Sequence, residues 1–160
     1  MKKLFIMFLL LTYASISFAK DLQWKNFNDG IAEAKKLNKK VLIDVYTDWC
    51  TWCKKMDAVT YADKNVKAYL EKNFVLIKLN ADGAGVITYA GQKISPAVFA
   101  QQMGVDGYPA TLFMKGNGEP ITILPGYSEP KTFIHVISYI AENQIGKKKF
   151  EDYLIEKGVK

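Results

Sequence analysis

The sequence predicts an α/β domain with a central mixed sheet and helices on both faces. Two short, nearly continuous apolar runs, 41–46 and 74–80, are typical of strands buried on both faces. Segments with helical spacing precede, separate and follow these runs, and a Gly-Asn-Gly turn at 116–118 joins two further strand-like runs. Residues 20–160 have the length of a single domain with its own hydrophobic core.

The first half of the domain is predicted to alternate helices with strands. Asn28 and Asp29 can cap a first helix, because side-chain oxygens at these positions accept backbone N–H bonds. The strand that follows contains one polar residue, Asp44, in an otherwise apolar run. The expected elements, in order, are a helix from about 28 to 37, a strand at 41–46, a helix from Thr51 to about Ala62, a helix capped by Asp63, and a strand at 74–80.

The second half begins with an interruption. The stretch 83–94 contains three glycines and predicts a loop or excursion inserted before the next helix. Ser95 and Pro96 then form a typical helix start. The expected elements after the insertion are a helix to about Met103, a hairpin of strands 110–115 and 121–124, a long helix from about Pro130 to Asn143, and a short extra C-terminal helix that holds Phe150, Tyr153 and Leu154.

The N-terminus predicts export. Lys2 and Lys3 precede an apolar stretch at 4–18, and Ser17-Phe18-Ala19 offers a small-residue cleavage site. We therefore expect residues 1–19 to be a signal peptide and 20–160 to be the mature domain, with the periplasm of a Gram-negative bacterium as its location. The alternative is that the segment is kept as a membrane anchor, although its strictly apolar part is short for a span.

Composition argues against several classes of partner and cofactor. All 22 basic residues are lysine, so the formal charge of +6 comes without the guanidinium groups that recognise phosphate and guanine bidentately. We expect no nucleic-acid partner. A structural zinc site needs four ligands, whereas the chain has two cysteines and one histidine. Covalent haem needs a histidine after the second cysteine, where Lys54 stands. We expect no metal and no cofactor besides a redox-active disulfide.

The two cysteines form a Cys-x-x-Cys motif, Cys50-Thr51-Trp52-Cys53. Cys50 falls where the predicted strand has ended and a helix begins, so unpaired N–H groups and the helix dipole should stabilise its thiolate. The thiolate is the attacking species in disulfide exchange. Cys50 is therefore the candidate nucleophile, and Cys53, about one helical turn later, is the candidate resolving thiol.

The segment from Asp44 to Lys54 resembles the active-site segment of the thioredoxin superfamily. Asp44 stands six residues before the first cysteine, where the family has its buried acid. The run 78–82, Lys-Leu-Asn-Ala-Asp, is similar to the end of the family's central strand, and Gly107-Tyr108-Pro109 resembles its cis-proline loop. With Gly126 after the hairpin, these landmarks cover essentially the mature chain and imply the thioredoxin fold.

The resemblance also implies roles for individual residues. Asp44 would lie beneath the cysteine pair and shuttle the proton of Cys53, with Lys78 as its charged neighbour. A buried carboxylate is costly unless it is paired or used, and burial raises its proton affinity. The alternative for Asp44 is a carboxylate satisfied by backbone hydrogen bonds at a strand end. Pro109 would be cis and face Cys50, and the backbone of Tyr108 would pair with an extended substrate segment.

Trp49 and Trp52 flank Cys50 and could form an apolar collar for a substrate peptide or a partner domain, since exposed aromatic residues near a site are typical contact residues. Trp52 could equally pack inward. The sequence leaves both orientations open.

The direction of electron flow depends on details that the motif does not settle. The dipeptide Thr51-Trp52 differs from the Gly-Pro of ordinary thioredoxins and the Pro-His of periplasmic oxidases. We favour a reductase of protein or small-molecule disulfides, because the approach from Tyr46 to Cys50 resembles exported thioredoxins fed by a membrane electron donor of the thiol:disulfide interchange type, including SoxW-type proteins. The alternatives are a disulfide-donating oxidase and a thioredoxin-fold binding or chaperone module without turnover. We expect a monomer.

Overall fold

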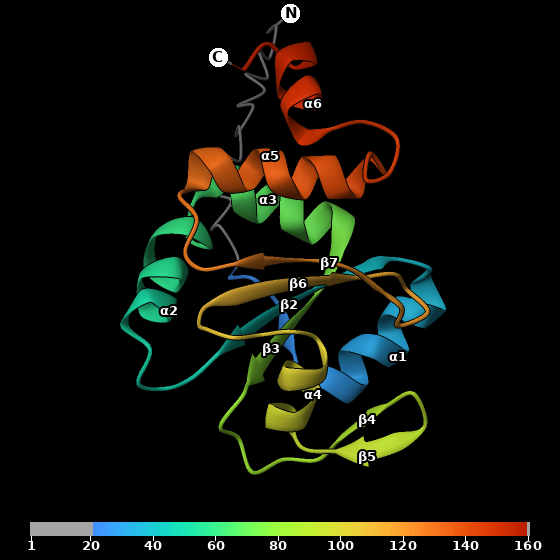
Figure 1. The fold of residues 1–160 in the computed structure, drawn as a ribbon. Coiled ribbons are helices and arrows are strands. Elements are labelled where there is room, and N and C mark those ends of the chain that lie inside the picture. The colour runs from blue at the N-terminus through green and yellow to red at the C-terminus, as the bar shows by residue number, and fades with distance from the viewer. Residues whose placement is uncertain (1–20, 160) are drawn as a thin grey trace, which may run out of the picture.

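The computed structural model describes residues 21–159, so the predicted signal peptide lies outside the described residues. The centre of the domain is a five-stranded sheet with the strand order β1-β3-β2-β6-β7 (Figure 1). The strands β1, β3 and β2 are parallel, β6 pairs antiparallel with β2, and the edge strand β7 pairs antiparallel with β6. The predicted mixed sheet is confirmed. The strands are β1 (Trp24–Lys25), β2 (Lys40–Tyr46), β3 (Phe74–Asn80), β6 (Ala110–Met114) and β7 (Pro120–Pro125).

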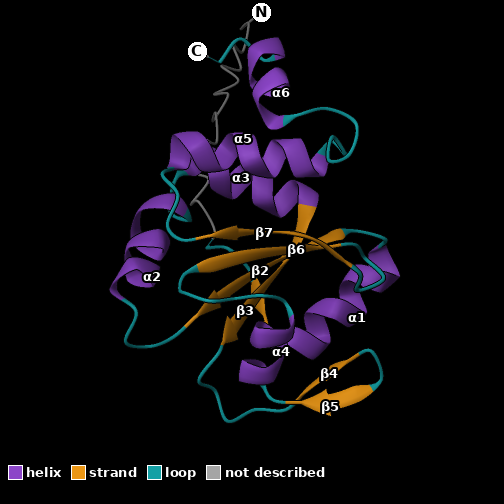
Figure 2. Ribbon diagram, in the orientation of Figure 1, coloured by secondary structure: helices purple, strands orange, loops and turns teal. Residues whose placement is uncertain are grey.

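Helices cover both faces of this sheet (Figure 2). On one face, α1 (Phe27–Leu37) and α4 (Pro96–Gln102) pack on the inward side chains of β2 at Val41, Ile43 and Val45. On the other face, the side chains of Leu42 and Phe113 pack against three helical elements: α3 (Lys64–Asn73), α5 (Pro130–Ala141) and the helix that follows Cys50. Alternation along β2 therefore places Asp44 on the same face as Leu42.

The helix after Cys50 differs from the prediction. It is α-helical only over α2 (Thr51–Lys55) and continues as a π-helical turn, η1 (Met56–Thr60). The Tyr61 N–H donates to the Met56 carbonyl oxygen at 2.9 Å, five residues back in the chain. This wider turn ends the helix before Ala62 and turns both Thr60 and Tyr61 into the interior.

Three further elements refine the predicted order. The first helix is capped by Asn26, whose side chain accepts from the Asp29 N–H, and not by Asn28 or Asp29 as predicted; it starts earlier because Phe27 packs against Phe99. The strand β1 was not predicted, since a two-residue strand carries no readable periodicity. The insertion 83–94 folds into a hairpin of β4 (Ile87–Tyr89) and β5 (Gln92–Ile94).

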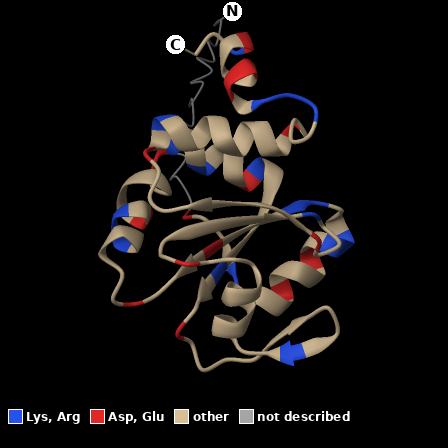
Figure 3. Cartoon of the chain, in the orientation of Figure 1, with Lys and Arg blue, Asp and Glu red and all other residues tan. Residues whose placement is uncertain are grey.

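The extra C-terminal helix is confirmed as α6 (Phe150–Glu156), which packs on α5. The lysine run 147–149 lies in the loop between α5 and α6 (Figure 3). Within residues 21–159, none of the helices has the length and apolar character needed to cross a bilayer.

Candidate active site

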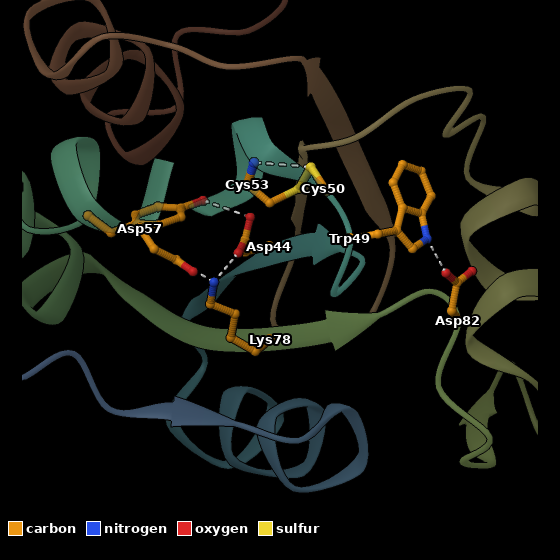
Figure 4. The surroundings of a disulfide bond; sticks show 8 residues. Asp44, Trp49, Cys50, Cys53, Asp57, Lys78 and Asp82 are labelled. Carbon is orange, nitrogen blue, oxygen red and sulfur yellow. Dashed lines mark hydrogen bonds and ion pairs between the residues drawn. A yellow bond between two sulfur atoms is a disulfide. The ribbon is translucent and has the colours of Figure 1, made fainter. Parts of the chain in front are cut away.

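Cys50 and Cys53 form a disulfide at the start of α2 (Figure 4). Cys50 is the N-cap residue of this helix, and its Sγ accepts a hydrogen bond of 3.0 Å from the Cys53 N–H. Both cysteines are buried. A sulfur at this position lies next to the free N–H groups and the positive end of the helix dipole. Both stabilise a thiolate once the disulfide is reduced.

A row of polar side chains crosses the buried face of the sheet below this helix. In the strand register, Asp44 of β2 lies opposite Lys78 of β3 on one side and Thr111 of β6 on the other. Asp44 is buried, with 1% of the residue surface exposed. Leu42, its neighbour along the same face of β2, is apolar. A charged group here must find its partners within the row or on the helix above it.

Lys78 supplies the main partner of Asp44. Its Nζ lies 2.5 Å from Oδ2 of Asp44 and 2.5 Å from Oδ1 of Asp57 on η1. The ammonium also lies 5.0 Å from the ring centroids of both Trp24 and Tyr46. Lys78 therefore pairs with one carboxylate on the sheet and one on the helix, and so links the two elements. The neighbouring aromatic rings also favour its positive charge.

Asp44 lies on the side of the sheet that faces Cys53 (Figure 4). Asp57 follows Cys53 by four residues, so the two side chains lie on neighbouring turns of one helix face. In Figure 4 the Asp44 carboxylate lies between Lys78 and the turn that carries Cys53. A carboxylate on this side of the motif is a candidate base for the second half of an exchange reaction.

Burial and charge shift the proton affinities of this pair. Burial raises the pKa of Asp44, and the nearby Lys78 ammonium offsets only part of that effect. Burial alone would lower the pKa of Lys78, but the carboxylates of Asp44 and Asp57 outweigh it and raise the pKa. Lys78 therefore stays charged, while Asp44 holds a proton more tightly than an ordinary aspartate.

Trp49 lies beside Cys50, and two contacts hold its indole in place (Figure 4). Its side chain is 68% exposed, yet its Nε1–H donates a 2.7 Å hydrogen bond to Oδ2 of Asp82 in the loop after β3. The rings of Trp49 and Tyr108 meet edge to face, with centroids 5.9 Å apart. Trp49 thus links the active-site turn to the Tyr108 loop.

Trp52, next to Cys53 in the chain, is largely exposed and has neighbours different from those of Trp49. It is 54% exposed, which answers the question that the sequence left open. Its ring lies 5.3 Å from that of Tyr127, and the Lys55 ammonium lies 4.8 Å and 4.7 Å from these two centroids. Two exposed aromatic side chains therefore border the disulfide.

The Tyr108–Pro109 peptide bond is cis. The Pro109 carbonyl oxygen accepts a 2.8 Å hydrogen bond from the N–H of Gly126, which has a φ of 76° at the end of β7. A glycine suits this left-handed backbone conformation. The loop that carries Pro109 is in this way tied to the neighbouring strand.

The structure brings Asp44, Lys78 and the cysteines together and adds partners that sequence reasoning missed. Asp57 could have been found from its four-residue spacing to Cys53 on a predicted helix. Tyr61 and Thr111 carried no such signal, because a π turn and the strand register position them. Among residues 21–159, no cluster of three or more His, Cys, Asp or Glu side chains could hold a metal ion.

Comparison with known proteins identifies the family. A family model described as the Thioredoxin-like domain matches residues 27–141. The thiol:disulfide interchange protein DsbD of Vibrio vulnificus (strain CMCP6) is 31% identical over 130 residues, which cover 80% of this chain and 20% of that protein. The chain thus spans a fifth of this relative's length.

Two solved structures show the same fold. A thioredoxin-fold protein from Helicobacter pylori has a TM-score of 0.62 at 20% identity, covering 76% of this chain and 80% of that one. The reduced C-terminal domain of Neisseria meningitidis DsbD has a TM-score of 0.52 at 23% identity, covering 69% and 90%. Because the family model spans more than half of the sequence and includes both cysteines, the chain belongs to the thioredoxin-like family of thiol:disulfide oxidoreductases.

Proposed function

We propose that this protein is a periplasmic thiol:disulfide reductase that passes electrons from the Cys50–Cys53 pair to disulfides of proteins or small molecules. The observation that carries the proposal is the buried Asp44 carboxylate, paired with Lys78 at 2.5 Å on the side that faces the turn of Cys53 (Figure 4). A binding module without turnover has no use for a buried base beside its cysteines, whereas exchange chemistry needs one.

The reaction consists of two exchange steps. The Cys50 thiolate attacks one sulfur of the substrate disulfide, forms a mixed disulfide with it, and releases the other substrate sulfur as a thiolate. Asp44 then accepts the proton of the Cys53 thiol, and the Cys53 thiolate attacks Sγ of Cys50. The Cys50–Cys53 disulfide forms and the second substrate thiolate leaves, so two electrons have passed to the substrate.

The surroundings of Cys50 suit an extended peptide. Trp49 and Trp52 offer exposed aromatic surface on two sides of the disulfide. Aromatic side chains contribute strongly to contacts with protein partners. We assign the peptide backbone of Tyr108, next to Pro109, to pairing with the substrate segment.

Export and the electron source belong to the same proposal. The predicted signal peptide at 1–19 supports a periplasmic location, where the pair would be oxidised unless a donor reduces it. A relative named as a thiol:disulfide interchange protein supports a membrane donor of that type. We assign the protein to the SoxW-type exported thioredoxins and expect it to act as a monomer.

The first test is the equilibrium of the Cys50–Cys53 disulfide with a glutathione redox buffer. A potential near the thioredoxin value of about −270 mV supports a reductase, and one near about −120 mV makes the protein an oxidase. If the pair does not exchange, the enzyme proposal fails and a binding module takes its place.

A second test identifies the attacking cysteine and its substrates. Cys53→Ser should accumulate mixed disulfides through Cys50, because the resolving thiol is missing. The matched control Cys50→Ser should trap none. Equal trapping by both variants would show that Cys50 is not the nucleophile.

A further inference from the structure

Tyr61 reaches the active-site base from the far end of the cysteine helix. Its side chain is 4% exposed. Its hydroxyl lies 3.3 Å from Oδ1 of Asp44, to which it donates, and 3.4 Å from Oγ1 of Thr111. The hydroxyl therefore sits between two members of the polar row on the sheet.

The π turn accounts for this position. In η1 the backbone hydrogen bond runs from Tyr61 to Met56, five residues back, so this turn is wider than an α-helical turn. The side chains of Thr60 and Tyr61 are both buried at its end. The Tyr61 ring is then held by edge-to-face contacts with Trp24 and Phe133, at centroid distances of 5.0 Å and 5.7 Å. Because these contacts already fix the Tyr61 ring, the hydrogen bond to Asp44 costs little further side-chain entropy.

The two oxygens of Asp44 have different partners. Oδ2 faces the Lys78 ammonium, and Oδ1 accepts from the Tyr61 hydroxyl. When Asp44 carries a proton, the same groups can reverse: the carboxyl donates to the Tyr61 oxygen, and the Tyr61 hydroxyl donates to Thr111. The hydroxyls of Tyr61 and Thr111 can thus satisfy Asp44 in both of its protonation states.

We propose that Tyr61 is a positioning residue that sets the pH at which Asp44 can take the proton of Cys53; this rests on the reductase proposed above. The hydrogen bond from Tyr61 stabilises the carboxylate form, and so it opposes the effect of burial on the pKa of Asp44. The charged and titratable groups that face Asp44 are Lys78 from β3, Asp57 from η1, Tyr61 itself and, once the disulfide is reduced, the Cys53 thiol (Figure 4).

The variant Tyr61→Phe removes only the hydroxyl and keeps the ring contacts. Tyr153→Phe is the matched control, because Tyr153 is another buried tyrosine and lies on α6, away from the polar row. The readout is the rate at which oxidised glutathione oxidises the reduced protein, measured across pH. For Tyr61→Phe we expect the midpoint to move upward by about one pH unit, with a rate about tenfold lower on the acid side. The control should follow the wild type.

A titration of the Asp44 carboxyl by carbon NMR tests the same contact without turnover. We expect the midpoint to rise in Tyr61→Phe and to rise less in Thr111→Val, which acts one hydrogen bond further away. Unchanged carboxyl titration and rate profile in Tyr61→Phe, or an equal shift in Tyr153→Phe, would overturn the role of Tyr61. A wild-type protein that fails to react with glutathione at any pH would overturn the reductase itself, which is a separate result.

Discussion

The Nζ atom of Lys78 lies 2.5 Å from Oδ2 of Asp44, and the two residues stand opposite each other on the parallel strands β3 and β2. Apart from Thr111, this buried face of the sheet carries apolar strand residues such as Leu42 and Phe113. An ion pair is costly in such a place, because both partners lose water. The position of the pair under the cysteine helix supports the proposed role of Asp44 as the base of the exchange reaction.

Replacing the base should slow the second exchange step. In Asp44→Asn no carboxylate can accept the Cys53 proton, so we expect resolution of the mixed disulfide to be about 100-fold slower at neutral pH. Stopped-flow measurement with oxidised glutathione separates this step from the first attack by Cys50. Equal rates in both proteins would remove Asp44 from the mechanism.

The same variant should change the pH dependence of stability. The folded-state pKa of Asp44 is raised above its unfolded value of about 3.9, so its contribution is fully present below that pH and is lost as pH rises through the folded pKa. Above it, Asp44→Asn should be more stable than the wild type, by about 1.4 kcal/mol for each unit of the shift. Urea unfolding at several pH values measures this, and a constant difference would contradict it.

Removing the cation should leave Asp44 unpaired. We expect Lys78→Met to lose about 2–3 kcal/mol of unfolding free energy at neutral pH, less than for a fully buried pair because Lys78 is partly exposed. The loss should shrink in acid, when Asp44 is protonated. Lys115→Met is the control, because it removes a lysine from an exposed pair with Glu119 and should change stability by less than about 1 kcal/mol.

The hydrogen bond from Trp49 to Asp82 predicts a selective effect on large substrates. Asp82→Ala removes the acceptor and frees the indole, so we expect KM for a protein disulfide to rise about fivefold. The rate with a small disulfide should stay unchanged, and Asp82→Asn should restore KM because its amide oxygen can accept. Asp106→Ala, an exposed control, should have no effect. A change with both substrates would point to a general role.

A steric prediction tests the packing of α1 on the sheet. A Cβ built on Gly30 would lie 2.3 Å from Cγ1 of Ile77, so Gly30→Ala must displace a buried side chain. We expect a loss of about 2 kcal/mol in unfolding free energy. Gly85→Ala, which meets no atom within 4 Å, should change stability little. An unchanged unfolding free energy in Gly30→Ala would mean that α1 can shift on β3 to make room for the methyl group.

The sequence by itself determined the features that depend on local pattern. Apolar runs and helical spacing predicted the main strands and helices, because each periodicity reflects which side chains a local backbone turns inward. The Cys-x-x-Cys motif predicted the exchange chemistry from residue type and spacing, and the resemblance to the thioredoxin superfamily implied the role of the acid in the strand before it. The short strand β1 and the hairpin at 87–94 were not predicted, since segments of two or three residues carry too little periodicity.

Only the tertiary structure decided which groups surround Asp44. Thr111 meets it through the register of β2 and β6, and Tyr61 meets it because a π turn reorients the end of the cysteine helix. Neither relation follows from sequence spacing, since strand register and the form of a helical turn are selected by how the whole core packs. The proton affinity of the base depends on these neighbours and on burial, so it too is a property of the folded chain.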